Sequence, residues 1–438
     1  MPDLRIRRPG RSASGHEDVG LVEVDSLFRR ESGRIVTALS RIFGLDNIAL
    51  AEDVMQDVFC RAIEVWKLRG VPRNPPAWLM KAAKNRAIDL IRRERTARNL
   101  VPELGRLLES EWTLVPTVND LFSAETIKDD QLRMIFSCCD PRLSEEVQVA
   151  LTLHLLCGFT IGEISAAFLS KRSTIEKRIE RGKKALAQSK RLFDLADVEL
   201  SQRLSAVHRA LYLLFNEGYH GASAHSAVRT ELCREAMRLG ALLLENPRVC
   251  APASYALCAL MWLHAARLSG RLDTHGNLIP LADQDRSLWD ATLIARGNEF
   301  LDRSASGQDL SEYHVEAAIA SLHCSAAREQ ETDWESVVWL YDLLVRIRPS
   351  PVIALNRAIA VAEQNGPERG IEAILAIPHR EQLGAYPFLP AALGELEFRA
   401  GRFERARKHF ETAVALARNP AERRFLEIRA DRCKLSPA

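Results

Sequence analysis

Residues 160–186 are TIGEISAAFLSKRSTIEKRIERGKKAL, and residues 78–98 are WLMKAAKNRAIDLIRRERTAR. Both stretches combine an apolar stripe at helical spacing with a dense run of Lys and Arg. In the later stretch, the turn LSKR has the length that joins a supporting helix to a recognition helix in a helix-turn-helix motif. Since basic patches bind polyanions by releasing condensed counterions, the two stretches predict contacts with nucleic acid. A solvated helix face is the alternative for either charge run alone.

The helix-turn-helix contains residues that begin and end helices. Gly158 is suited to end the preceding helix as a C-cap, and Thr160 with Glu163 forms a capping box. Ser173 is predicted as the N-cap of the recognition helix. The outward face of that helix holds side chains that suit guanine edges and phosphate oxygens, namely Arg172, Ser173, Thr174, Lys177, Arg178 and Arg181.

The earlier basic helix follows a proline-rich loop. The segment GVPRNPPAW (residues 70–78) must end the helix before it, and the basic helix is predicted to start near Ala77. Such a loop can present groups to a single unstacked base while the helix follows a strand backbone. Trp78 has two interpretations, stacking on that base or anchoring the helix in a core, and the core role is favoured. The basic face holds Lys81, Lys84, Asn85, Arg86, Asp89, Arg92 and Arg93.

The whole chain favours an all-α fold. At 438 residues it is too long for one compact core, so several domains are expected. Helical spacing of apolar residues recurs from Leu27 onward, and neither strand-like alternation nor a glycine-rich phosphate loop occurs.

Nine cysteines without a CxxC pair fit a reducing cytoplasm. The first twenty residues lack the apolar core of a signal peptide, and no apolar run suits a membrane span.

Two segments of the chain resemble those of a known family, and they occur in the same order as in that family. AEDVMQDVFCRAIEVW (residues 51–66) with PPAWLMKAAKNRAIDLIRRERTARN (residues 75–99) resembles region 2 of the extracytoplasmic-function group of sigma-70 type transcription initiation factors. The helix-turn-helix resembles their region 4, and the match covers roughly residues 25–190. The turn LSKRST departs from the glycine-containing turn often seen in the family, which leaves the first residue of the recognition helix open.

The resemblance implies partners and roles. Asp53, Gln56 and Asp57 would dock on the β′ clamp of core RNA polymerase, whose β and β′ subunits are the expected partners, although a solvated acidic face is the alternative. The proline loop and the basic helix would recognise and melt the −10 element, and the recognition helix would enter the major groove at the −35 element of promoter DNA. Such factors hydrolyse no nucleotide, so neither a catalytic residue nor a cofactor is expected. The side chains that contact the −10 element would be Trp78, Lys81, Lys84, Asn85, Arg86, Arg92 and Arg93.

Residues 191–438 follow the helix-turn-helix, and they resemble the extension of one long subgroup of these factors, which is related to tetratricopeptide repeats. The resemblance rests on LYLLFNEGYHG (211–221), LCREAMRLGALLLENP (232–247), LADQDRSLWD (281–290) and PSPVIALNRAIAVAEQNGP (349–367). The residues support a repeat independently, since Leu393, Gly394, Ala406, Phe410 and Ala413 match the repeat spacing.

Two positions depart from the repeat pattern, because Pro390 replaces the usual Trp and Glu397 the usual Tyr. Residues 334–349 and 356–378 are predicted as more degenerate helical pairs. Stacked pairs would form a concave face suited to a peptide or a helix of a protein partner. An irregular helical bundle is the alternative for this part of the chain.

Two polar segments in the extension suggest other roles. Glu217, Tyr219 and His220 cluster in FNEGYH, but the spacing of His220, His225 and Cys233 matches no common zinc pattern, so no metal is expected. Asp283, Asp285 and Arg286 are interpreted as an ion-paired structural cluster, with a solvated cluster or a ligand contact as alternatives.

The sequence therefore favours a cytoplasmic, non-enzymatic sigma factor whose C-terminal domain regulates its activity. A ligand-sensing helix-turn-helix regulator that acts without polymerase is the alternative, but it leaves the segment at 51–66 unexplained. A third hypothesis is that the extension is an enzyme or a scaffold, but it contains no recognisable set of catalytic residues. The predicted organisation is a flexible arm over residues 1–24, a region 2 domain over 25–98, a linker over 99–128, a region 4 domain over 129–190, a helical extension over 191–310 and tetratricopeptide-like repeats over 311–438.

Overall fold

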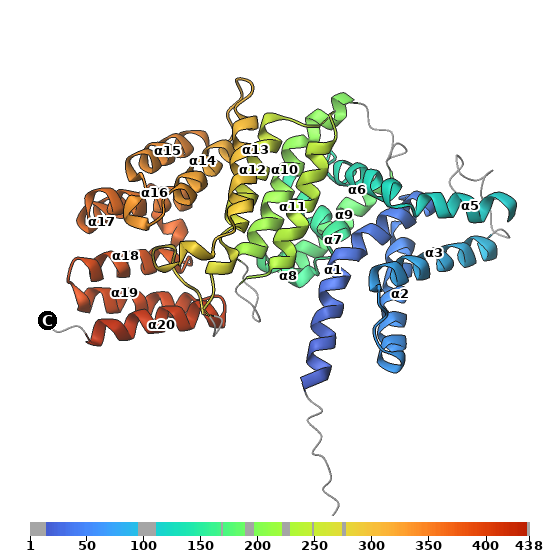
Figure 1. Ribbon diagram of the computed structural model, residues 1–438, viewed down its shortest axis with the longest axis horizontal. Helices are drawn as coiled ribbons and strands as arrows, with labels where there is room; N and C mark the ends of the chain where they lie inside the picture. Colours follow the sequence, from blue (N-terminus) through green and yellow to red (C-terminus); the bar gives the residue numbers. More distant parts are fainter. Residues whose placement is uncertain are drawn as a thin grey trace, which may run out of the picture. The chain divides into compact units, whose positions relative to one another are not determined.

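The computed structural model describes residues 15–94, 111–167, 170–188, 197–220, 228–247, 249–273 and 277–435. Within these ranges every long element is a helix, and the one β-type pairing is an isolated bridge between Leu272 and Leu278. The predicted all-α fold is confirmed. The chain forms two compact units (Figure 1), the first from residues 1–164 and 173–195 and the second from residues 165–172 and 196–438.

The first part of the chain folds into helices that range from 7 residues in α8 to 29 residues in α1. They are α1 (Gly15–Phe43), α2 (Ile48–Arg69), α3 (Pro75–Glu94), α5 (Glu111–Leu121), α6 (Ala124–Cys138), α7 (Glu145–Cys157), α8 (Ile161–Ala167) and α9 (Arg172–Ala187). Helix α1 begins at Gly15, so residues 15–24, predicted as part of the flexible arm, are helical; residues 1–14 lie outside the described residues. The predicted linker over 99–128 contains α5 and the first turn of α6, so helices form within it.

One apolar cluster joins α1, α2, α3 and α5. Leu39, Val58 and Leu79 are buried in it, so these helices turn their apolar stripes inward and their charges outward. Helix α1 also packs on α7 at unusually close range. A Cβ at position 33 would lie 2.0 Å from the carbonyl oxygen of Leu156, so only glycine allows this backbone approach.

The predicted caps around the helix-turn-helix are mostly confirmed. Gly158 ends α7 in the left-handed region at φ 66°, and its amide donates to the carbonyl of Leu153. Thr160 and Glu163 form the capping box, with the Thr160 amide 2.9 Å from Glu163 Oε2 and the Glu163 amide 3.3 Å from Thr160 Oγ1. The N-cap prediction for Ser173 is wrong. Helix α9 starts at Arg172, which places Ser173 inside its first turn and not at the cap position before it.

The second unit contains two sets of helices. The first set is α10 (Asp197–His220), α11 (Thr230–Glu245), α12 (Pro252–Ala265) and α13 (Ala291–Ser304). The second is α14 (Glu312–Ser325), α15 (Trp334–Ile347), α16 (Pro351–Asn365), α17 (Pro367–Leu375), α18 (Phe388–Arg399), α19 (Phe403–Leu416) and α20 (Pro420–Leu435). A segment with three short 3-10 turns joins α12 to α13. From α14 to α20 each helix packs on the next one in the sequence, as in a helical repeat array (Figure 1).

Helices α18 and α19 have the predicted repeat contact. A Cβ at Gly394 would lie 3.0 Å from the ring of Phe410, so the small residue lets the two helices cross closely. Glu397 is buried where the repeat pattern has Tyr, and it forms an ion pair with Arg402. The prediction of a helical pair over residues 334–349 is wrong. This segment is the single helix α15 and its end, because no helix breaker interrupts WESVVWLYDLLVRI.

Candidate nucleic-acid and polymerase interface

The proline-rich loop joins α2 to α3 through a short connection. Gly70 ends α2 at φ 78°, a value that favours glycine. Asn74 Oδ1 accepts a hydrogen bond from the Ala77 amide at 3.1 Å, which caps α3 before Pro75 begins it. Helix α3 therefore starts two residues earlier than the predicted start at Ala77, because both prolines suit its first turn.

A hollow of about 590 Å³ lies between α2 and α3. It brings together most of the side chains predicted to contact the −10 element, and Arg92 and Lys84 are absent from its lining. Half-buried Trp78 contacts Trp66 edge to face, with ring centroids 5.5 Å apart, so it packs on the core while one side lines the hollow. The lining consists of Asp57, Val58, Arg61, Trp78, Lys81, Ala82, Asn85, Arg86, Asp89 and Arg93.

The predicted polymerase-binding side chains lie on the outer face of α2. Asp53, Gln56 and Asp57 are all exposed, whereas Val54 and Val58 are buried. Asp57 Oδ2 lies 3.4 Å from Arg86 Nη2, and the exposed fraction is 64% for the Asp57 side chain and 37% for the Arg86 side chain. An exposed pair of this kind contributes about 0–1 kcal/mol, so it can exchange for other partners at little cost. Sequence reasoning assigned the two residues to separate roles and missed their contact.

Helix α9 separates its apolar and basic residues as predicted. Ile175, Ile179 and Leu186 are buried. A Cβ at Gly182 would lie 2.9 Å from the Leu151 side chain, which holds α9 close to α7. Of the side chains predicted to contact the −35 element, Arg178 is half-buried, and the exposed ones are Arg172, Ser173, Thr174, Lys177 and Arg181. Most of this set thus faces solvent along one helix.

Glu52 links α2 to both α7 and α9, a contact that the sequence did not reveal. Its carboxylate lies 2.6 Å from Lys183 Nζ and 3.3 Å from His154 Nε2, and only 13% of its side chain is exposed. Burial raises the pKa of Glu52, but hydrogen bonds and charge from His154 and Lys183 outweigh this and lower it overall. Glu52 and Asp53 are neighbours in the sequence, and only the fold shows that the Glu52 carboxylate is paired whereas that of Asp53 is exposed.

The polar segments of the extension have structural partners. Glu217 pairs with Arg229, and Asp283 Oδ2 lies 3.0 Å from Arg429 Nη2. Asp285 caps a 3-10 turn through the Ser287 amide. Arg286 was predicted to be ion-paired, but it donates to the carbonyl oxygens of His323 and Ala326, both at 2.8 Å, because the end of α14 leaves carbonyls without helical partners.

Neither a metal cluster nor a membrane helix is found in the part of the chain that the structure describes. No group of three His, Cys, Asp or Glu side chains there could hold a metal ion. His225, which was considered as a zinc ligand, lies outside the described residues. In the same ranges no helix is both long and apolar enough to cross a bilayer.

Comparisons with known proteins match three parts of the chain. Residues 27–97 match Sigma-70 region 2, and residues 133–186 match Sigma-70 region 4. Residues 203–305 match a family of unknown function, DUF6596. The chain belongs to the extracytoplasmic-function sigma factors. It carries a helical C-terminal extension beyond the two sigma regions, and it acts in transcription initiation through DNA binding.

Individual relatives are similar to different shares of the chain. An uncharacterized protein of Rhizobium meliloti (strain 1021) is 36% identical over 404 residues, which cover 92% of this chain and 93% of the relative. The ECF RNA polymerase sigma factor SigK of Mycobacterium sp. (strain KMS) is 25% identical over 181 residues, covering 37% of this chain and 89% of SigK. No solved structure gives a significant match. The similarity to SigK thus covers little more than a third of this chain, whereas the similarity to the Rhizobium protein spans nearly all of it, most of the extension included.

Proposed function

We propose that this sigma factor binds core RNA polymerase through its β and β′ subunits and directs it to promoters by recognising −10 and −35 elements. The observation that carries the proposal is the outward placement of charge on α2, α3 and α9, in segments that match regions 2 and 4. The factor would act in the cytoplasm, where RNA polymerase works. Members of this family are not enzymes, so binding alone would supply the function.

Recognition of the −10 element would use the hollow between α2 and α3. Trp78 forms part of its wall, and Lys81, Asn85, Arg86 and Arg93 supply donors along its rim. An unpaired base could enter the hollow while the basic side chains follow the phosphate backbone. Lys84 and Arg92 lie on the same helix and would extend this backbone contact beyond the hollow. Capturing the unpaired base would favour the melted strand without nucleotide hydrolysis.

Recognition of the −35 element would use the exposed face of α9. Arginine can contact guanine through two hydrogen bonds, and Ser and Thr suit phosphate oxygens. Arg178 and Arg181 would contribute base contacts, with Lys177 and the first turn of α9 on the backbone. Helices α7 and α8 would support α9 against the DNA, as the supporting helix does in a helix-turn-helix.

Docking on polymerase would use Asp53, Gln56 and Asp57 on α2. These exposed side chains complement a basic surface, and Asp57 can release Arg86 on docking because the exposed pair is weak.

The two DNA elements lie roughly 85 Å apart, since ~25 base pairs rise ~3.4 Å each. We therefore propose that the Glu52 contact with Lys183 breaks when α3 and α9 engage their separate elements.

The C-terminal extension would regulate activity through a partner. Its repeat-like helices α14 to α20 offer surfaces for a peptide or a helix of another protein. The predicted domain boundaries, with region 4 ending at residue 190 and the repeats starting at residue 311, belong to this proposal.

Truncation after Ser189 should change transcription from the promoter and leave binding to core polymerase intact. Unchanged transcription by the truncated chain would refute a regulatory extension.

Transcription of genomic fragments by purified core polymerase tests the main proposal. With the full chain present, we expect defined RNA start sites that are absent with core polymerase alone. Sequencing the RNA 5′ ends would identify the elements upstream of each start. Tight binding to duplex DNA without polymerase, together with no added start sites, would instead support the polymerase-independent regulator.

A further inference from the structure

The second unit contains a partly open cavity of about 730 Å³, which is within the size range of small-molecule sites, about 300–1,000 Å³. Its walls come from α10, α12, α14, α15, α16, α20 and the start of α18, and from the segment that follows α12. The repeat-like helices and the helices before them thus share one interior space. No motif in the sequence indicated it, because its lining is spread along the chain from Tyr212 to Leu426.

Two arginines give one side of the cavity a positive charge. Arg267 is only 6% exposed, and neither Arg267 nor Arg271 has a carboxylate partner among the described residues. The Nε atoms of both are buried without a hydrogen-bond acceptor. Arg271 lies over the ring of Tyr219, with Cζ 3.9 Å from the ring centroid. Arg271 is half-buried, and a buried guanidinium nitrogen without an acceptor is costly, so the two Nε atoms favour an anion that supplies one.

The neighbouring histidines add hydrogen bonds but no charge. Burial, with the nearby positive charge of Arg267, lowers the pKa of His323 to about 4 and lowers that of His264 as well. Nδ1 of each is buried without a partner, as is the hydroxyl of Tyr219, which is 2% exposed. Several unpartnered polar atoms therefore gather beside the two arginines, where a bound molecule could satisfy them together.

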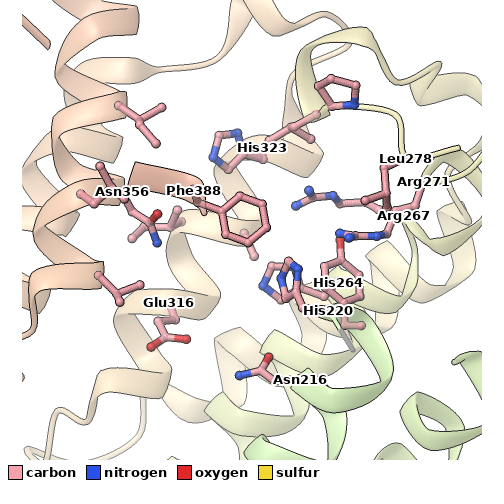
Figure 2. A pocket seen from close by; sticks show the side chains of 18 of the residues that line it. Asn216, His220, His264, Arg267, Arg271, Leu278, Glu316, His323, Asn356 and Phe388 are labelled. Atoms are coloured by element: carbon pink, nitrogen blue, oxygen red, sulfur yellow. The ribbon is translucent and has the colours of Figure 1, made fainter. Parts of the chain in front are cut away.

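The opposite side of the cavity has a different character. Figure 2 shows Arg267 and Arg271 on one side, Glu316 and Asn356 on the other, and Phe388 projecting between them. Burial raises the pKa of Glu316 to about 7, so near neutral pH this carboxyl can either donate or accept a hydrogen bond. Arg418, a third arginine in the lining, is already paired with Glu422. The uncompensated charge is therefore confined to the side with Arg267 and Arg271.

We propose that this cavity binds a small organic anion whose carboxylate or phosphate group contacts Arg267 and Arg271 and whose apolar body packs against Phe388. Arginine suits both head groups because its planar fork can donate two parallel hydrogen bonds. A polar group at the far end of the molecule would contact Glu316 and Asn356. This binding site goes beyond the proposed function, and its test needs neither polymerase nor DNA.

Fluorescent probes can test the charge preference on the full chain. Anilinonaphthalene sulfonate is an aromatic anion, and phenylnaphthylamine has a similar shape without the charge. We expect saturable binding of the sulfonate, displaced by benzoate or phenyl phosphate but not by benzylamine, which is similar in size and opposite in charge. The stronger of the two competing anions identifies the preferred head group. Equal displacement by benzoate and benzylamine would overturn the proposal.

A pair of variants links the preference to the cavity. Arg267→Gln combined with Arg271→Gln should weaken sulfonate binding at least ~10-fold, because two charge-assisted hydrogen bonds are lost, and leave phenylnaphthylamine binding within ~2-fold. Arg369→Gln is the matched control, since Arg369 is 68% exposed and absent from the lining. Unchanged sulfonate binding by the double variant would contradict the proposal. If circular dichroism shows that it does not fold, the displacement result on the wild-type chain decides.

Discussion

The two units of this sigma factor use arginine and lysine in opposite ways. In the sigma regions, the basic residues of α3 and α9 are mostly exposed and lie along helix faces. In the extension, Arg267 and Arg271 line a partly open cavity, and among the described residues neither has a carboxylate partner. Charge runs in the sequence therefore revealed the first set and not the second. The difference indicates that one unit meets an extended polyanion such as DNA, whereas the other has room for a single small anion.

The largest expected effect comes from reversing charge on α9. Lys177→Glu with Arg178→Glu should reduce promoter-dependent transcription ~100-fold or more, because the base contact of Arg178 is worth about 1–3 kcal/mol and the reversed charge at both positions repels the phosphates. Run-off transcription with core polymerase measures this. Arg369→Glu, a reversal on the exposed surface of the other unit, should leave it unchanged. Equal losses from both reversals would remove the contrast between the units.

Substitution of Gly33 tests whether the sigma regions form one packed body. Gly33→Ala should destabilise the α1–α7 contact by about 3 kcal/mol, since the added Cβ would lie 2.0 Å from a backbone oxygen and neither backbone can yield easily. Hydrogen exchange of α7 amides reports the opening. Gly162→Ala is the control, because its Cβ would meet only Thr160 Oγ1 at 3.9 Å. Equal exchange in the two variants would mean that α1 and α7 do not pack closely in solution.

Removing the charge of Glu52 should have a smaller effect on the same contact. Glu52→Gln should weaken the link between α2 and α9 by about 1–2 kcal/mol through the loss of a charge-assisted hydrogen bond to Lys183. Because folding lowers the pKa of Glu52, its contribution is present above the ordinary value of 4.5 and is lost as pH falls through the lower folded value. Exchange rates of α9 should therefore rise at low pH in the wild type more than in the variant. Parallel pH profiles would contradict this link.

The smallest effect is expected at an exposed pair in the extension. Asp283→Asn should change the unfolding free energy by less than about 0.5 kcal/mol, because the Asp283 side chain is 60% exposed and water screens its attraction to Arg429. Arg429 also keeps a second partner, Glu395, at 3.1 Å. Urea unfolding of the two chains measures the difference. A loss above about 1 kcal/mol, the upper end for an exposed ion pair, would show that this pair fastens the segment after α12 to α20.

The sequence predicted those parts of the fold that depend on local pattern. The all-α fold, the Gly158 cap and the Thr160–Glu163 box follow from residues within one turn of each other, and the structure confirms them. The Ser173 cap failed because the preference for Ser at caps does not fix the start of a helix, and α9 begins one residue earlier. Residues 334–349 were misassigned because a degenerate repeat has weak boundaries.

Contacts between distant segments could not be predicted. Glu52 and Lys183 are 131 residues apart, and Asp57 and Arg86 were assigned to different partners although they meet. The cavity of the extension depends on arginines, histidines and aromatic side chains that single motifs do not group. Spatial convergence of this kind appears only when helices pack. By contrast, the exposed faces of α2, α3 and α9 follow from helical periodicity, so their side chains could be named in advance.

Permanganate reactivity of promoter thymines tests the central claim most directly. On a promoter identified by 5′-end sequencing, we expect thymines near the −10 element to become reactive only when core polymerase and this chain are both present, and without nucleotide hydrolysis. Reactivity that needs no polymerase, or no reactivity when both are bound, would contradict the assignment of α3 and its loop to promoter melting.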